Sequence, residues 1–187
     1  MQVWKWNGAS NDFTTLLPVR DEDLLSGVFS ADGTLKSWAK PPEVRPGIEK
    51  HAKDQRPLGD LSFVMGGSVV LNAKAYAALG EFLGAFGQFL QMDLLDGTRM
   101  AGGKQPLYFY NVTNVITCID FARSHTEGKK VIEPFFVPGS VPAGAQVFKD
   151  PLRKKADIYL NEPAHVQLTA LIEGAGLLGS TMSLVSR

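Results

Sequence analysis

Two segments of the chain share the same order of apolar and polar positions. Residues 69–87 read VVLNAKAYAALGEFLGAFG, and residues 158–176 read IYLNEPAHVQLTALIEGAG. Each starts with a short apolar run typical of a buried strand and then places apolar residues at helical spacing up to a glycine. The identical positions are Leu71, Asn72, Ala75, Leu79 and Gly87 in the first segment and Leu160, Asn161, Ala164, Leu168 and Gly176 in the second. The pattern predicts two strands that each lead into a helix.

Both predicted helices have the same start and stop signals. Asn72 and Asn161 stand where an N-cap side chain accepts a hydrogen bond from the first turn, and Gly87 and Gly176 stand where a left-handed residue closes a helix. We expect helices over residues 73–85 and 162–175, each with an apolar stripe that packs on a sheet. The stripes are Tyr76, Leu79, Leu83 and Phe86, and Leu168, Leu171, Ile172 and Ala175. An internal duplication and ordinary strand-to-helix chemistry both explain the likeness.

The other apolar runs predict strands. These are LSFV from residue 61, QFLQMDLL from residue 88 and STMSLV from residue 180. Residues 107–120, LYFYNVTNVITCID, predict one long strand or two strands joined by a bulge near Asn114. Alternation there gives an apolar face with Tyr108, Tyr110 and Val112 and a partly polar face with Asn111, Thr113 and Thr117. We expect an α+β fold: a mixed or antiparallel sheet with two principal helices packed on it.

The first 57 residues differ in composition from the rest of the chain. They hold Trp4, Trp6 and an acidic cluster at residues 21–23, followed by a segment rich in proline and charge. Proline removes a backbone donor and fixes φ, so this segment cannot sustain a long helix or a central strand. We therefore expect a small proline-rich N-terminal arm or appended layer over residues 1–57 and an α+β core domain over residues 58–187.

Charge and composition limit the compartment and the partners. Nineteen basic residues balance nineteen acidic residues, so the chain lacks the positive excess with which most nucleic-acid-binding proteins neutralise phosphates. The longest uncharged stretch, residues 134–148, is broken by prolines and glycines, and Cys118 has no second cysteine to pair with. No apolar leader follows the first residues. We expect a cytoplasmic protein that binds neither nucleic acid nor a membrane.

The sequence offers no catalytic or metal-binding motif. His51, His125 and His165 each lack a second ligand at metal-binding spacing, and Cys118 stands inside an apolar run that is typical of a buried thiol. We therefore expect a protein that is not an enzyme and uses no cofactor or metal. A basic group in irregular segments, made of Lys129, Lys130, Arg153, Lys154 and Lys155, is the candidate partner-binding surface, since loops often carry variable recognition.

The order of four segments resembles a known bacterial family. The segments are residues 66–92, the YFYNVTNVITCIDFARS run from residue 108, the VFKDPLRKKADIYLNE run from residue 147, and AGLLGSTMSL from residue 175. This succession is similar to a family formerly classed as a domain of unknown function and now grouped with the immunity proteins of polymorphic toxin systems, of the type first named from a myxobacterial member. The resemblance extends from Trp38 to Leu184.

The resemblance implies a function that needs no active site. Members of this family are cytoplasmic antidotes encoded beside a toxin that competing cells exchange, and they protect their owner by binding the toxin. The expected partner is therefore a cognate toxin or effector protein from the neighbouring gene.

Two other functions stay open on the residues alone. The polar strand face at Asn111, Thr113 and Thr117 would line a hydrolase-like pocket with Asp120 as the acid or base. Alternatively, Tyr108 and Tyr110 would line the apolar pocket of a small-ligand or regulatory binding module.

Overall fold

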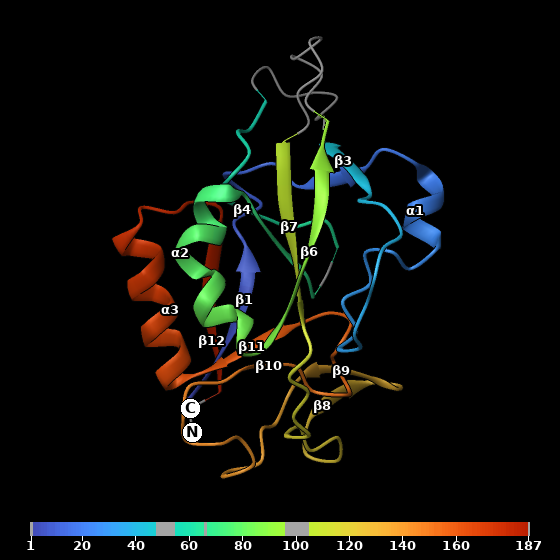
Figure 1. Cartoon of the computed structure of the whole chain (residues 1–187). Helices are drawn as coiled ribbons and strands as arrows, with labels where there is room; N and C mark the ends of the chain where they lie inside the picture. The colour runs from blue at the N-terminus through green and yellow to red at the C-terminus, as the bar shows by residue number, and fades with distance from the viewer. Residues whose placement is uncertain (1, 48–54, 66, 96–104, 187) are drawn as a thin grey trace.

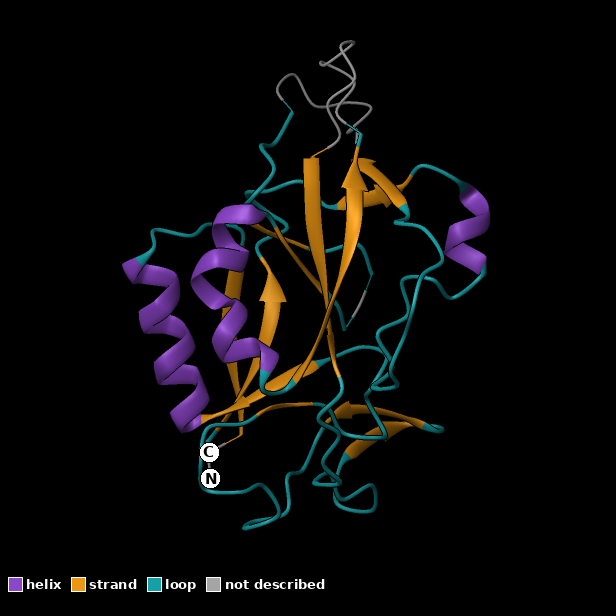
Figure 2. Ribbon diagram, in the orientation of Figure 1, coloured by secondary structure: helices purple, strands orange, loops and turns teal. Residues whose placement is uncertain are grey.

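A computed structural model describes residues 2–47, 55–65, 67–95 and 105–186. Within them lie three helices and two larger sheets, so the expected α+β class with mixed and antiparallel sheets is confirmed (Figure 1, Figure 2). The helices are α1 (Asp21–Leu25), α2 (Ala73–Gly84) and α3 (Glu162–Gly174). Among the described residues no helix has the length and apolarity needed to cross a membrane.

The strands form a four-stranded sheet, a six-stranded sheet and a hairpin. The four-stranded sheet is antiparallel, in the order β10 (Val147–Phe148), β11 (Ile158–Asn161), β1 (Val3–Gly8), β12 (Ser180–Ser186). The six-stranded sheet has the order β2 (Leu16–Pro18), β3 (Glu43–Pro46), β6 (Gly87–Leu94), β7 (Gln105–Val112), β5 (Val69–Leu71), β4 (Leu61–Ser62). Its one parallel pair is β3 with β6. The hairpin pairs β8 (His125–Glu127) with β9 (Lys130–Glu133).

The six-stranded sheet curls until its edges approach each other. The amide of Leu16 in β2 donates to the carbonyl of Phe63, the residue after β4, at 2.9 Å. Leu61 in β4 donates in turn to the carbonyl of Leu178, which precedes β12, at 2.9 Å. The sheet is therefore nearly closed, like a barrel, and its β4 edge is joined to the four-stranded sheet.

The two segments that share a sequence pattern build matching units. In the first, β5 leads through α2 to β6, and β7 lies between β5 and β6, antiparallel to both. In the second, β11 leads through α3 to β12, and β1 lies between β11 and β12, antiparallel to both. Each unit is thus a strand–helix–strand whose two strands are separated by an inserted antiparallel strand. The inserted strand follows the first unit in the sequence and precedes the second, so internal duplication and ordinary strand-to-helix chemistry both stay open as explanations.

Both expected N-caps are confirmed. Asn72 accepts from the amide of Ala75 at 2.9 Å, and Asn161 accepts from the amide of Ala164 at 3.2 Å. Each Asn has extended backbone angles, as an N-cap requires. The helices they start end one residue earlier than the expected bounds.

Only one of the two expected closing glycines has that role. Gly176 has φ of 56°, the left-handed conformation that follows a helix. Gly87 lies instead in β6 and its φ is not positive. A Cβ there would stand 2.9 Å from the ring of Tyr110 and 2.9 Å from the Cα of Val112, so this glycine permits close strand packing.

Helices α2 and α3 lie side by side over the main core (Figure 1). Leu79, Leu83 and Leu168 are fully buried there, between the helices and strands of both sheets. The other stripe residues are only partly buried, and Tyr76 is exposed. Two further clusters fill the far face of each sheet: one around Phe29 and Phe109, the other around Phe148 and Tyr159.

Residues 107–120 form neither the one long strand nor the two bulge-joined strands that the sequence indicated, since after β7 only isolated bridges at Val115 and Ile119 follow. β7 ends at Val112, because the amides of Thr113 and Asn114 turn away to donate to the carbonyl of Phe86. Both faces of β7 are buried, since Phe109 joins one core cluster and Tyr110 another. Asn111 is fully buried, and its amide nitrogen donates to the carbonyl of Thr34 at 2.7 Å.

The N-terminal segment enters both sheets. β1 is an inner strand of the four-stranded sheet, so residues 3–8 are not an appendage as expected. Alternating residues explain this position: Trp6 joins the core beneath the helices, whereas Val3 joins the core on the opposite face. β2 and β3 extend the six-stranded sheet at one edge. The division of the chain at residue 57 stays a prediction for the residues that follow β1.

Candidate functional site

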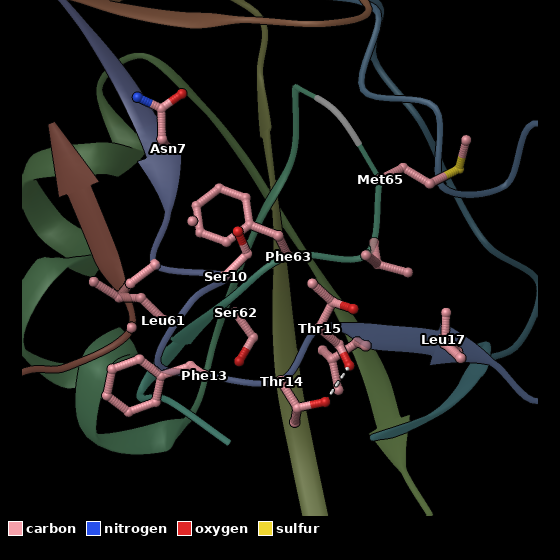
Figure 3. A pocket seen from close by; sticks show the side chains of 15 residues that line it. Asn7, Ser10, Phe13, Thr14, Thr15, Leu17, Leu61, Ser62, Phe63 and Met65 are labelled. Carbon is pink, nitrogen blue, oxygen red and sulfur yellow. Dashed lines mark hydrogen bonds between the residues drawn. The ribbon is translucent and has the colours of Figure 1, made fainter. Parts of the chain in front are cut away.

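A pocket of about 390 Å³ opens where the two sheets meet (Figure 3). Three stretches build it: the end of β1 with the chain that follows it to β2, β4 with the residues after it, and the glycine before β12. The lining consists of Asn7, Gly8, Ala9, Ser10, Phe13, Thr14, Thr15, Leu16, Leu17, Leu61, Ser62, Phe63, Val64, Met65 and Gly179. No signal in the sequence singled out these residues, because they come from separate segments that only the fold brings together.

The chemistry of the lining is apolar with a few hydroxyl groups. Phe13 and Phe63 stand on one side of the view, and Leu17 and Met65 on the other (Figure 3). The Thr14 hydroxyl donates to the carbonyl of Gly47 at 2.9 Å, so it is already engaged. None of the lining residues has a side chain that titrates near neutral pH. The pocket can hold an apolar group, but its lining supplies no titratable general acid or base that could activate its hydroxyl groups.

Two glycines fix the walls of the pocket. A Cβ on Gly8 would stand 2.6 Å from the ring of Phe63, so the glycine lets this ring lie across the end of β1. Gly179 has φ of 110°, a conformation that side-chain-bearing residues rarely adopt. The amide of Ala9 donates to the carbonyl of Gly179 at 3.0 Å, which ties the two walls together.

The basic residues predicted as a partner-binding surface lie on two neighbouring segments. Lys129 is in the turn of the β8–β9 hairpin and Lys130 begins β9, and both are exposed. Lys155 is exposed in the turn over residues 151–156. The two segments are joined where Arg153 Nη1 donates to the carbonyl of Val131 at 2.6 Å. The structure therefore places Lys129, Lys130 and Lys155 as exposed cations on adjacent loops.

Arg153 serves the fold and not an open surface. Its Nε lies 2.5 Å from Oδ2 of Asp157, a carboxylate whose side chain is only 3% exposed. Lys5 Nζ reaches Oδ1 of the same carboxylate at 2.7 Å. Burial acts to raise the pKa of Asp157, but hydrogen bonds and charges from Arg153 and Lys5 outweigh it and lower the pKa. The charge of Arg153 is thus committed to a buried carboxylate.

The segment also holds a buried lysine that sequence reasoning missed. Lys149 is fully buried, and its Nζ donates to the carbonyls of Ala31, Gly67 and Lys154. Three carbonyl acceptors match the three donors of an ammonium group. Burial lowers the pKa of Lys149 to about 7, against the opposing attraction of Asp32 and Asp157. This lysine joins three separate segments, and its partly buried neighbour Lys154 contributes a carbonyl to the same junction.

The residues of the hydrolase-like alternative do not converge. Asn111 contacts Thr34 and Gln88 on β6, whereas Thr117 is exposed after the end of β7. Asp120 Oδ1 accepts from the amides of Ala122 and Arg123 and so holds a local turn. Within the described residues none of these three lines the pocket. Thr113, the fourth residue of this alternative, lines a separate hollow with Phe86, Asn114 and Gln146, which holds none of the other three.

The tyrosines of the binding-module alternative also lie elsewhere. Tyr110 is fully buried, and its hydroxyl donates to the carbonyl of Leu83 at 2.8 Å. Burial raises the pKa of Tyr110 far above its ordinary value. Tyr108 stacks on Tyr76 with ring centroids 3.9 Å apart, so it is occupied by a partner from α2. Neither ring lines the pocket.

His165 and Cys118 have structural surroundings. His165 stacks on Trp4 with centroids 4.2 Å apart, and burial lowers its pKa. His51 lies outside the described residues. Burial and the nearby carboxylate of Asp150 raise the pKa of the Cys118 thiol, which opposes thiolate formation. The described part of the chain contains no group of three potential metal ligands among His, Cys, Asp and Glu.

No protein-family model matches the chain, and no curated protein matches it at a significant level.

Proposed function

We propose that this protein is an immunity protein that neutralises a cognate antibacterial toxin by binding it directly in the cytoplasm. The observation that carries the proposal is the pocket, which is apolar, open and free of titratable side chains. Such a pocket suits an anchor side chain of a protein partner and does not suit acid–base catalysis. The sequence resemblance to the immunity proteins of polymorphic toxin systems supports the same reading.

In this proposal, the two longer helices and the sheets behind them are the rigid scaffold. The N-terminal segment supplies strands to both sheets, and the chain after β1 contributes the pocket wall from Ser10 to Leu17. The partner inserts an apolar side chain between Phe63 and Leu17. Lys129, Lys130 and Lys155 form a basic rim of the recognition surface that speeds association with an acidic toxin surface.

Co-expression with the toxin encoded by the neighbouring gene tests the function. An inhibitor that blocks the toxin through an interface of about 1,200 to 2,000 Å² protects at a one-to-one ratio. Cell survival should therefore rise until the molar amount of antidote equals that of toxin. The two proteins should then co-purify. Protection at clearly substoichiometric antidote, or protection without a complex, would show turnover and contradict the proposal.

A matched pair of variants tests the pocket. Leu17 lines it and is 38% exposed, whereas Leu25 on α1 is 93% exposed and does not line it. We expect Leu17→Glu to weaken toxin binding at least tenfold, because a desolvated anchor contact contributes about 2 kcal/mol or more to the binding free energy. Leu25→Glu should leave binding unchanged. Equal effects of the two variants would exclude the pocket as the anchor site.

A small-ligand or regulatory binding module is the second candidate function. The pocket volume of about 390 Å³ falls in the range of ligand sites. Native mass spectrometry of protein purified from its own cells separates the two candidates. A bound small molecule that Leu17→Glu releases would favour the binding module, whereas a protein complex would favour the antidote.

A further inference from the structure

β12 is an outer strand with an unusual composition. It is the last strand of the four-stranded sheet, with β1 on one side and no strand on the other among the residues that the structure describes. Its seven residues, STMSLVS, include no charge and no proline. Thr181, Ser183 and Leu184 are exposed. An exposed edge of this kind presents unpaired peptide groups and is prone to pair with another strand.

The other sheet edges in the described chain are protected. β2 has three residues and ends in Pro18, and Leu16 bonds across to Phe63 near β4. β4 and β10 have two residues each. The β8–β9 hairpin carries charge on both strands, at Glu127 and Lys130 among others. Short length, proline and charge are common means by which proteins block edge pairing, and β12 has none of them. Its pairing with β1 does contain one irregularity, since Trp4 pairs with Leu184 and Val3 with Ser186, which skips Val185 near the end of the strand.

The side chains of β12 are complementary to themselves. Met182 and Leu184 point to the face covered by α3, since Met182 packs in the core beneath the helices and Thr169 of α3 contacts its sulfur at 3.8 Å. Thr181 and Ser183 point to the opposite face, where Asn7 donates to the Ser183 hydroxyl at 3.0 Å. An antiparallel copy centred on Ser183 places Met182 opposite Leu184 of that copy and Thr181 opposite its Val185.

We propose that this protein forms a two-fold dimer in which β12 pairs antiparallel with β12 of a second copy, centred on Ser183. The proposal does not rest on toxin binding. The two four-stranded sheets become one continuous sheet of eight strands, and the axis perpendicular to that sheet keeps both α3 helices on the same face. Apolar side chains then meet apolar ones beside α3, and no charge faces a like charge.

Cysteine crosslinking tests the register. Two Ser183 positions would face each other across the axis with Cβ atoms about 4.5 to 5.5 Å apart, close to disulfide geometry. Ser183→Cys should therefore yield a disulfide-linked dimer under mild oxidation. Thr181→Cys is the matched control, because its two copies would lie four residues apart along the pair, about 13 Å, too far to bridge. The native Cys118 is buried and leaves the reaction to the new thiol.

Charge substitution tests the interface. Sedimentation of the parent protein should show dimer at micromolar concentration. Ser183→Lys sets like charges opposite each other at the axis and should weaken self-association at least tenfold, whereas Ser183→Ala loses the same Asn7 bond without charge and should remain dimeric. Circular dichroism checks that both variants are folded.

Three results would overturn the proposal. A parent protein that stays monomeric at several hundred micromolar would reject the β12–β12 dimer, and a strand from another protein would then be the candidate partner of this edge. A dimer that Ser183→Lys leaves intact would place the interface elsewhere. Equal crosslinking at positions 183 and 181 would reject the register and the two-fold pairing centred on Ser183.

Discussion

Replacing Asn161 by alanine should cost much more stability than replacing Asn72, although both residues cap helices at matching positions. Asn72 is partly exposed, and its amide nitrogen donates to Asp60 at 2.8 Å. Asn161 is only 4% exposed and uses every polar atom of its side chain. Besides capping α3, its Oδ1 accepts from the amide of Gln146 at 2.9 Å. Its Nδ2 donates to two carbonyls of the preceding loop, those of Pro142 at 3.0 Å and Gly144 at 2.7 Å.

The difference between the two sites follows from their contacts. An N-cap Asn replaced by Ala costs about 1 kcal/mol, and this term applies to both helices. At Asn72, water can replace the hydrogen bond from the side-chain amide to Asp60, so we expect a total of about 1 kcal/mol. At Asn161, three further partly buried hydrogen bonds are lost, at about 0.5 to 1 kcal/mol each, so we expect a total of about 3 kcal/mol.

Urea unfolding with linear extrapolation measures both costs, provided the slope with urea stays the same in both variants. Asn161→Asp is the matched control, because it keeps the capping oxygen and loses the two amide donors. The free energy of unfolding of this variant should fall well below that of the parent. The difference then gives the contribution of the loop hydrogen bonds apart from that of the cap. If Asn161→Ala and Asn72→Ala lose equal stability, the loop bonds contribute nothing and the reasoning is refuted.

Three other outcomes are expected. Leu79→Ala and Leu168→Ala should each cost about 2 to 5 kcal/mol through lost burial and a residual cavity, and calorimetric midpoints equal to the parent's would remove both from the core. Arg153→Ala should cost about 3 kcal/mol because it removes a partner from the buried carboxylate of Asp157. If chemical denaturation shows no loss in the free energy of unfolding, Arg153 does not stabilise the fold and is again a candidate for partner binding. Because burial lowers the pKa of Lys149 to about 7 from its ordinary 10.5, the unfolded chain binds more protons between these values, so stability rises with pH there. Lys149→Met should abolish this rise, which urea midpoints at pH 7 and pH 8.5 would show.

The local signals of the sequence were reliable where the chemistry is local. An Asn before an apolar stripe specifies its own hydrogen bond to the third residue, and both caps formed as expected. Gly87 has the same sequence context as Gly176 but a different role, because the approach of Tyr110 and Val112 from β7 decides its conformation. Nothing near Gly87 in the sequence encodes that contact.

Long-range features could not be read in the same way. β1 looks like an isolated tryptophan-rich start, and only its pairing with β11 and β12 makes it an inner strand. The candidate pocket draws its walls from residues 7–17, 61–65 and 179, so no short motif contains it. Lys149 and Arg153 look alike in a basic run, yet the fold buries the first and pairs the second with Asp157. Composition cannot distinguish a surface cation from one that binds internal acceptors.

The position of β1 also determines when the molecule can finish folding. Val3 pairs with Ser186, so β1 waits for β12, which follows all the other described strands in the sequence. Until then its tryptophans have no completed sheet to lie in, whereas β5, α2, β6 and β7 form a continuous stretch that can assemble earlier. Contacts of such long sequence separation are slow to close because the intervening loop is costly to order. We expect the first unit to appear before the second during refolding, which pulse-labelling hydrogen exchange would detect as early protection of β7 and late protection of β1.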